Sequence, residues 1–327
     1  MRALQIAELD GPDALSVVDL PDPAASHFLT PDQGVLIDVK AAAVSFPDLL
    51  QSRGLYQFKP DLPFVPGAEV AGVVAEAPPD SGLEAGDRVA AMTMLGGMAE
   101  RAAAPAPLTF KLPDQLDFAQ GAALILNYHT AYFALKLRGR LGEGERVLVH
   151  GAAGGVGTAC LQVAKALGAS TVAVVSTEEK ERVAREAGAD DVVRSDGPWR
   201  EHVQEITGGG VDVVLDPVGG DRFKDSLRAL REEGRLVVVG FTGGSIPEVK
   251  VNRLLLNNVD VVGAGWGAYV LSKPELSRKI AAELDAMIAA GTVRPIVGAR
   301  FPLDRASDAM RLIEERGALG KVVLDVS

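Results

Sequence analysis

The pattern of apolar and polar positions changes part-way along the chain, near residue 118. Before that point, short apolar runs rich in valine and alanine are separated by prolines and glycines, which is typical of strands joined by irregular loops. Strands are expected at residues 1–8, 35–44, 70–76, 88–92 and 99–104. Many short strands with such loops favour a partly closed β-barrel.

After residue 118 the apolar period alternates between that of a strand and that of a helix. Asp117 can cap a helix that runs to about residue 137. Beyond it, strands are expected at 147–149, 171–175, 191–193, 212–215 and 235–239. Helices are expected at 158–167, 178–187, 199–207 and 222–231. Strands and helices that alternate in this way predict a doubly wound parallel sheet.

The last part of the chain continues this mixed pattern. It predicts a strand at 259–263, a long helix at 274–290, then another strand, a helix at 304–316 and a strand at 321–326. The closing elements can return to the first domain. A chain of 327 residues is too long for one ordinary core, so two domains are the expectation.

A glycine-rich turn, with the sequence G-A-A-G-G-V-G, links the strand at 147–149 to the next helix. Ala152 stands where a dinucleotide fingerprint usually has its first glycine. Such a turn lets the backbone approach a pyrophosphate, and the helix N-terminus offers free N–H groups. The expected cofactor contacts here are Gly154, Gly155, Val156 and Gly157. The alternative is a tight turn that binds nothing.

Composition excludes several classes of protein. The net charge of −11 argues against a general binder of nucleic-acid phosphates, which needs a basic surface. Cys160 is the only cysteine, so the chain can form neither an intrachain disulfide nor a thiolate zinc cluster. We find no targeting segment and no apolar stretch long enough to span a bilayer. A cytoplasmic protein is therefore the expectation.

Further motifs occur in a fixed order along the chain. They are A-V-S-F-P-D at 43–48, R-G-L-Y at 53–56, P-G-A-E-V-A-G at 66–72, G-D-R-V at 86–89 and G-K-V-V-L at 320–324. Together with the glycine turn, this set resembles the zinc-free quinone oxidoreductases (the zeta-crystallin-like family) of the medium-chain dehydrogenase/reductase superfamily. The resemblance covers essentially the whole chain.

The resemblance implies an α/β architecture of two domains. A GroES-like catalytic domain, a partly open β-barrel, would span residues 1–123 and be completed by 297–327. A Rossmann domain that binds NADPH would span residues 124–296. A homodimer is also typical of this family, often paired through the last Rossmann strands, which here points to residues 260–264.

Two departures bear on metal binding. Zinc-bearing relatives place a cysteine where this chain has Ser45 and a histidine where it has Ala68. Neither a hydroxyl nor a methyl group can replace those ligands effectively. We therefore expect no metal. Because the related zinc-free enzymes often have asparagine at the position of Ser45, the hydrogen bonds made there are not set by the resemblance.

The end of the second Rossmann strand bears on the choice between NADPH and NADH. An NAD site usually has an acidic residue there, about 20 residues after the glycine turn, but this chain has Ser176 and Thr177. A small hydroxyl leaves room for a 2′-phosphate, and Lys180 and Arg194 are candidate cations for it. Glu178 and Glu179 are the alternative, either as a displaced NAD-type acid or as favourable charges at a helix N-terminus. NADPH is the expected cofactor.

The resemblance also implies which residues surround the nicotinamide. The expected catalytic residues are Ser45, Tyr56 and Thr130, and Asn127 joins Ser45 and Thr130 as a cofactor contact. Tyr56 can donate a hydrogen bond to a developing oxyanion, or it can pack as a loop aromatic on the barrel rim. Thr130 can instead be a buried helical threonine that bonds its own backbone. Asp48 is expected to cap a helix at 49–53.

Three further cofactor contacts are expected. Gly240 and Phe241 follow a strand at the carboxyl edge of the sheet, where ligands bind in open α/β folds. Lys321 lies in the closing G-K-V-V-L motif. Asn127, Tyr128 and His129 are consecutive, so they cannot all face one site.

The function expected from these residues is zinc-independent hydride transfer from NADPH to a quinone. Without a metal or base to take a proton, an intrinsically good acceptor is favoured over an alcohol. The alternative is an NADPH-dependent reductase of enones or of enoyl thioesters. A non-catalytic NADPH sensor or RNA-binding protein is the third reading, although no basic stripe with interleaved aromatic residues supports RNA binding.

Overall fold

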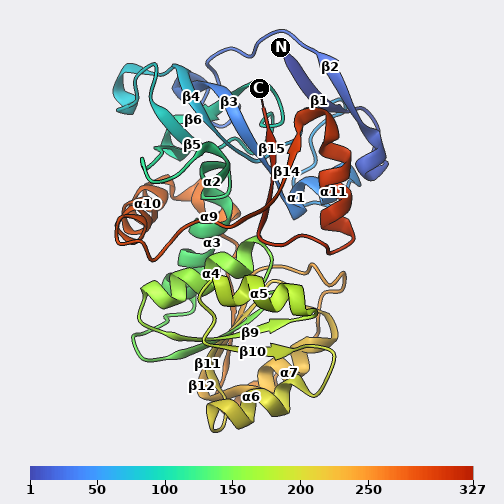
Figure 1. The fold of residues 1–327 in the computed structure, drawn as a ribbon, viewed down its shortest axis with the longest axis vertical. Helices are drawn as coiled ribbons and strands as arrows, with labels where there is room; N and C mark the ends of the chain where they lie inside the picture. Colours follow the sequence, from blue (N-terminus) through green and yellow to red (C-terminus); the bar gives the residue numbers. More distant parts are fainter. Residues whose placement is uncertain (327) are drawn as a thin grey trace. The chain divides into compact units, whose positions relative to one another are not determined.

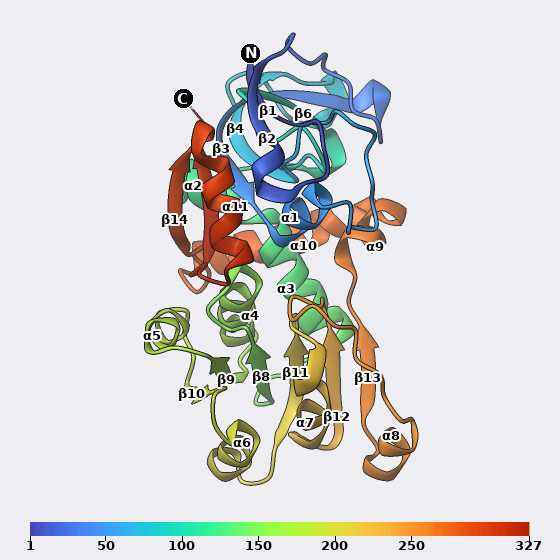
Figure 2. The ribbon, with the colours of Figure 1, turned by 90° about the vertical axis from the view of Figure 1, so that its right-hand side faces the viewer.

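The computed structural model describes residues 1–326, and the chain forms two compact units. Unit 1 contains residues 1–126, 273–285 and those from 295 onward, and unit 2 contains residues 127–272 and 286–294. Both are drawn in Figures 1 and 2. No helix in the described part of the chain is both long and apolar enough to cross a membrane.

Unit 1 is built around a seven-stranded sheet that uses both ends of the chain. The strand order is β14-β15-β3-β4-β5-β7, and β6 also pairs with β3. The strands are β3 (Gly34–Val44), β4 (Glu69–Glu76), β5 (Arg88–Met92), β6 (Arg101–Pro105), β7 (Thr109–Lys111), β14 (Val297–Pro302) and β15 (Lys321–Asp325). The two ends of this order are not paired with each other, so the sheet is open and no barrel is closed.

A second, two-stranded sheet in unit 1 joins β1 (Arg2–Ile6) to β2 (Leu15–Asp19). The helices of this unit are α1 (Phe46–Ser52), α2 (Phe118–Ala122) and α11 (Ala306–Glu314), and α10 (Pro274–Ala289) begins in it. The strands expected in the first 120 residues are confirmed, but β2 and β7 were not expected. Most of β2 is exposed and β7 has three residues, so neither shows a long apolar pattern.

Unit 2 contains a six-stranded, fully parallel sheet, which confirms the doubly wound prediction. The strand order is β10-β9-β8-β11-β12-β13. The strands are β8 (Arg146–His150), β9 (Ser170–Val175), β10 (Asp191–Arg194), β11 (Val211–Asp216), β12 (Leu230–Val238) and β13 (Asp260–Gly263). Counted within the unit this is the order 3-2-1-4-5-6 of dinucleotide-binding folds, and it reverses direction between β8 and β11.

In the described part of unit 2, five helices lie between these strands in the chain, and a sixth follows the last strand. They are α4 (Gly155–Ala166), α5 (Glu178–Glu186), α6 (Trp199–Thr207), α7 (Phe223–Arg228), α8 (Asn252–Asn257) and α9 (Trp266–Ser272). The helix expected at 222–231 is wrong at its end, because β12 begins at Leu230 and pairs there with Val211 of β11. The short helices α8 and α9 were not expected.

The helical segment after Asp117 has an unusual interior. The carboxylate of Asp117 accepts a hydrogen bond from the Gln120 N–H at 2.8 Å, which confirms the expected cap. Beyond α2 the segment is wider than an α-helix at Ile125–His129 and Phe133–Arg138, with α3 (Thr130–Tyr132) between. Such π-helical turns are rare and occur frequently at functional sites.

Candidate functional site

The glycine turn of unit 2 lies at the point where the strand order reverses. Gly151 follows β8 with φ at +58°, a conformation that disfavours residues with a side chain. A Cβ at Gly157 would lie 2.2 Å from the carbonyl oxygen of Gly151, so this position admits only glycine. The helix α4 begins at Gly155, which leaves the N–H groups of its first turn without helical partners. The turn can therefore receive an anion.

Two other turns at this edge of the sheet are linked to the glycine turn, one directly and one through its neighbour. The turn after β11 approaches it, since a Cβ at Gly151 would be 3.3 Å from Val218 Cγ2. The turn that begins at Gly240 packs on the β11 turn, where Thr242 N–H donates to the Pro217 oxygen at 3.1 Å. The expected contacts Gly240 and Phe241 thus lie at the carboxyl edge of the sheet, and the Phe241 side chain is partly exposed.

Asn127 lies against the first turn of α4. A Cβ at Gly155 would be 2.5 Å from Asn127 Nδ2. The neighbouring Tyr128 hydroxyl donates to Gln162 at 3.0 Å, and the His129 ring packs edge-on against Trp266. The three consecutive side chains face different surroundings, as expected. Thr130 is buried at the start of α3.

Ser176, Lys180 and Arg194 lie together at the carboxyl ends of β9 and β10. The Lys180 ammonium donates to Ser176 Oγ at 3.3 Å, and Arg194 Nη2 donates to the Ser176 carbonyl oxygen at 2.8 Å. Arg194 Nε is buried and has no hydrogen-bond partner within residues 1–326. Two cations and a hydroxyl thus surround one exposed position, which suits a phosphate.

The acidic residues after Ser176 are at the start of α5. Thr177 is the N-cap of this helix, and its hydroxyl accepts from the Lys180 N–H at 3.2 Å. Glu178 and Glu179 follow in the first turn and are exposed. Carboxylates are favoured at that place by the helix dipole.

A buried polar cluster in unit 1 joins Ser45, Asp48, Glu69 and Lys321. The Lys321 ammonium forms an ion pair with the Glu69 carboxylate and donates to Ser45 Oγ at 2.7 Å. The second Glu69 oxygen accepts from the Leu126 N–H at 2.6 Å. These contacts follow from the strand register, because Val322 of β15 lies opposite Val44 of β3.

Asp48 was expected to cap a helix at 49–53, and this expectation is wrong. The helix α1 begins at Phe46, with Ser45 as its N-cap and a proline in its first turn, where proline is favoured. Asp48 is the third residue of the helix, and its carboxylate accepts from the Ser45 N–H at 2.7 Å and from the Gly67 N–H at 3.2 Å.

The acid–base properties of this cluster follow from its burial. Burial raises the pKa of the Asp48 carboxyl to about 6, with a smaller contribution from the charge of Glu69. The two backbone N–H groups and the Lys321 ammonium oppose that rise. Burial also raises the pKa of the half-buried Tyr56, and the Asp48 charge adds to the effect. Tyr56 therefore keeps its proton at neutral pH and can donate it in a hydrogen bond.

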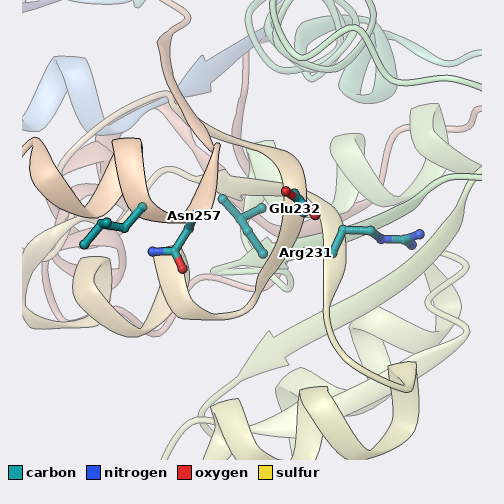
Figure 3. A pocket seen from close by; sticks show the side chains of 5 residues that line it. Arg231, Glu232 and Asn257 are labelled. Atoms are coloured by element: carbon teal, nitrogen blue, oxygen red, sulfur yellow. The ribbon is translucent and has the colours of Figure 1, made fainter.

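Two shallow hollows in unit 2 contain none of the expected site residues. The one in Figure 3 has a volume of about 290 Å³ and lies between the start of β12 and the end of α8. A second, of about 440 Å³, is lined by Asn258, Asp260 and their neighbours. Both are at the amino ends of the strands, whereas ligands of such sheets bind at the carboxyl ends.

Comparison with known proteins identifies the family. Residues 31–114 match the alcohol dehydrogenase GroES-like domain family, and residues 155–283 match the zinc-binding dehydrogenase family. Quinone oxidoreductase-like protein 2 of Bos taurus is 38% identical over 330 residues, which are 99% of this chain and 92% of the relative. The chain belongs to the zinc-free quinone oxidoreductases of the medium-chain dehydrogenase/reductase superfamily. This confirms the resemblance seen in the motifs.

Solved structures of the superfamily have the same fold. A probable oxidoreductase from Mycobacterium abscessus is 44% identical with a TM-score of 0.90, and the match covers 99% of this chain and 98% of that one. The Escherichia coli quinone oxidoreductase, solved in complex with NADPH, is 31% identical with a TM-score of 0.89, covering 99% and 100% of the two chains.

The description of one matched family refers to zinc, and the residues of this oxidoreductase do not fit that metal. Ser45 Oγ receives a hydrogen bond from the Lys321 ammonium, so a cation already lies against it. Ala68 offers no donor atom. Within residues 1–326, no group of three or more His, Cys, Asp or Glu side chains is placed to hold a metal ion.

The sequence did not single out Glu69 as a functional residue, although it lies inside the P-G-A-E-V-A-G motif. It was hidden because it begins a strand whose next six residues carry no polar side chain. A carboxylate at the start of a buried strand could have identified it, because a buried carboxylate needs a cation or a hydrogen-bond donor beside it. Lys321 was singled out as a cofactor contact, and the structure places its ammonium on Glu69 and Ser45.

Proposed function

We propose that this oxidoreductase transfers a hydride from NADPH to a quinone. The observation that carries the proposal is the group formed by Ser176, Lys180 and Arg194, which supplies a hydroxyl and two cations where an NAD site has an acidic residue. The glycine turn fits a pyrophosphate for the reasons given above. Relatives that are named quinone oxidoreductases, one of them solved with NADPH, support both the cofactor and the acceptor.

The protein's own residues have separate tasks in this reaction. NADPH supplies the hydride when it is bound. In unit 2 the first turn of α4 would hold the pyrophosphate. Asn127 lies against this turn, and Thr130 belongs to the same helical segment as Asn127. In unit 1 Tyr56 and Ser45 offer hydroxyl groups that can stabilise negative charge on the oxygen of the acceptor.

The test is the oxidation of NADPH and NADH by the purified protein with a panel of acceptors. The panel contains 9,10-phenanthrenequinone, 1,4-benzoquinone, an aliphatic enal and crotonyl-CoA. We expect turnover with the quinones and a preference for NADPH. Faster turnover of the enal or of crotonyl-CoA would make the protein an enoyl reductase, and tight NADPH binding without turnover would make it a sensor or binding protein.

We also propose that the protein is a homodimer that pairs through β13. This strand is at the end of the sheet order and pairs with β12 on one side. The preceding helix α8 carries Leu255 and Leu256, each 75% exposed, and such clustered apolar exposure is typical of protein interfaces. Pairing of two β13 edges would continue the sheet across the dimer.

Replacement of both leucines by glutamate (L255E/L256E) is expected to convert the dimer into a monomer, because two charges per copy would be buried at the interface. Sedimentation or light scattering would measure this. Ile206→Glu is the matched control, since Ile206 is an exposed apolar residue on α6. A wild-type monomer, or a double variant that stays dimeric, would refute the proposed interface.

A further inference from the structure

In the buried cluster of Ser45, Glu69 and Lys321, the hydroxyl of Ser45 accepts a hydrogen bond and keeps its own hydrogen available. An ammonium group has only hydrogens to give, so in its contact with Lys321 the Ser45 oxygen must be the acceptor. The hydroxyl hydrogen of Ser45 is then directed elsewhere. The hydrogen bonds described for residues 1–326 include no acceptor for it.

The exposed fraction is small for every member of the cluster. Asp48 is 0% exposed, Glu69 1% and Lys321 4%, whereas Ser45 is 7% exposed. All four residues are buried, and Ser45 has the largest exposed fraction of the four. With its hydrogen unassigned, the Ser45 hydroxyl is the group of this cluster that can donate to a small molecule.

The enclosed charges are held in place from several sides. Glu69 is fixed by the Leu126 N–H through one oxygen and by Lys321 through the other. The Ser45 backbone is fixed by Asp48, which is itself held by the Gly67 N–H. A donor whose position is set before the substrate arrives needs no reorganisation during the reaction, which is what makes such donors effective.

We propose that the ion pair of Lys321 and Glu69 makes the Ser45 hydroxyl a fixed hydrogen-bond donor to the carbonyl oxygen of the substrate. Lys321 is then a positioning residue that acts through Ser45. The inference rests on the proposed function, because it requires an acceptor with a carbonyl oxygen.

The chemistry balances with water as the only further reactant. The hydride brings two electrons and one hydrogen to the quinone, and the negative charge appears on a quinone oxygen. Ser45 donates a hydrogen bond to that oxygen and keeps its own proton. Water supplies the proton that completes the hydroquinone.

The test is a double-mutant cycle on kcat with Ser45→Ala and Lys321→Met. Loss of the Ser45 hydroxyl is expected to lower kcat about 100-fold, as for other preorganised oxyanion donors. Lys321→Met is expected to lower kcat at least about 10-fold in the wild-type background, but less than about twofold in the S45A background, because its effect passes through Ser45. The Kd for NADPH is measured by fluorescence in both variants, so that a loss of cofactor binding is separated from a loss of kcat.

A charge-free variant separates this role from a structural one. K321M leaves Glu69 buried without its partner, which can destabilise the fold, whereas E69Q/K321M removes both charges and avoids that penalty. We expect the double variant to recover the thermal stability of the wild type but not its kcat. Lys111→Met, which removes a surface ion pair with Asp87, is the matched control and should leave kcat unchanged.

Two results would overturn the inference: an equal loss of kcat on Lys321→Met with and without the Ser45 hydroxyl, or recovery of kcat in E69Q/K321M. If the wild type reduces the enal or crotonyl-CoA but no quinone, the proposed acceptor is wrong, and the same cycle run on the carbonyl compound it does reduce decides the inference. A wild type that binds NADPH and reduces none of these acceptors overturns both.

Discussion

Replacement of both Lys180 and Arg194 by alanine is expected to lower kcat/KM for NADPH by about 100-fold and to leave kcat/KM for NADH almost unchanged. Hydrogen bonds to a charged group contribute about 1.5 kcal/mol each at the lower end of their range, and about 1.4 kcal/mol corresponds to a factor of ten. The 2′-phosphate is the part of the cofactor that these two side chains would bind, and NADH lacks it. Steady-state kinetics with each cofactor would measure the ratio.

Two further variants sharpen this experiment. Lys165→Ala removes another lysine of unit 2, which pairs with Asp190, and should change neither cofactor's kinetics. Ser176→Asp places a carboxylate where NAD sites usually have one, so it should repel the 2′-phosphate and improve the use of NADH. An equal loss with both cofactors in the double variant would show that the group does not distinguish them.

Acidification from pH 7 to pH 5 is expected to lower the free energy of unfolding of unit 2 by about 4 kcal/mol. Burial lowers the pKa of His129 to about 3 and that of His150 to about 4, with His150 also affected by the opposing charges of Asp216 and Arg222. Between pH 6.5 and pH 4 the unfolded chain therefore binds two protons that the native chain does not. Each histidine contributes about 2 kcal/mol at pH 5.

Tryptophan fluorescence can follow this transition in unit 2 by itself. The chain has two tryptophans, Trp199 and Trp266, and both are buried in that unit. His129→Gln should remove about half of the loss in stability between pH 7 and pH 5. The control is His202→Gln, at an exposed position on α6. A wild type equally stable at both pH values would contradict the assignment of these two histidines as buried and neutral.

The sequence predicted most of unit 2, because parallel strands buried on both faces are continuous apolar runs and the helices between them are amphipathic. It failed where tertiary pairing decides the structure. The run from Arg222 to Arg231 has helical character, but Leu230 is the first residue of β12 because it pairs there with β11. The helix α8 has only six residues and exposes its leucines, so its apolar pattern does not mark a buried face.

The site was predictable to the extent that its residues are local in the sequence. The glycine turn and the group around Ser176 depend on residues that follow directly from strand ends. The contact between Ser45 and Lys321 could not be read from spacing, because it depends on the pairing of β3 with β15. Asp48 was misread because α1 begins two residues before it, with Pro47 in its first turn.

The late place of β15 in the chain has a consequence for the synthesis of the protein. This strand covers residues 41–44 of β3, yet it follows all of unit 2 in the chain. At about 5–20 residues per second, a ribosome leaves that part of β3 uncovered for on the order of 15–60 s. Unit 2 can fold during this interval. Unit 1 still has an unpaired edge on β3, and Glu69 does not yet have Lys321 as its ion-pair partner. A nascent chain that stalls before Lys321 therefore keeps an unpaired strand edge, which is a template for pairing with other chains.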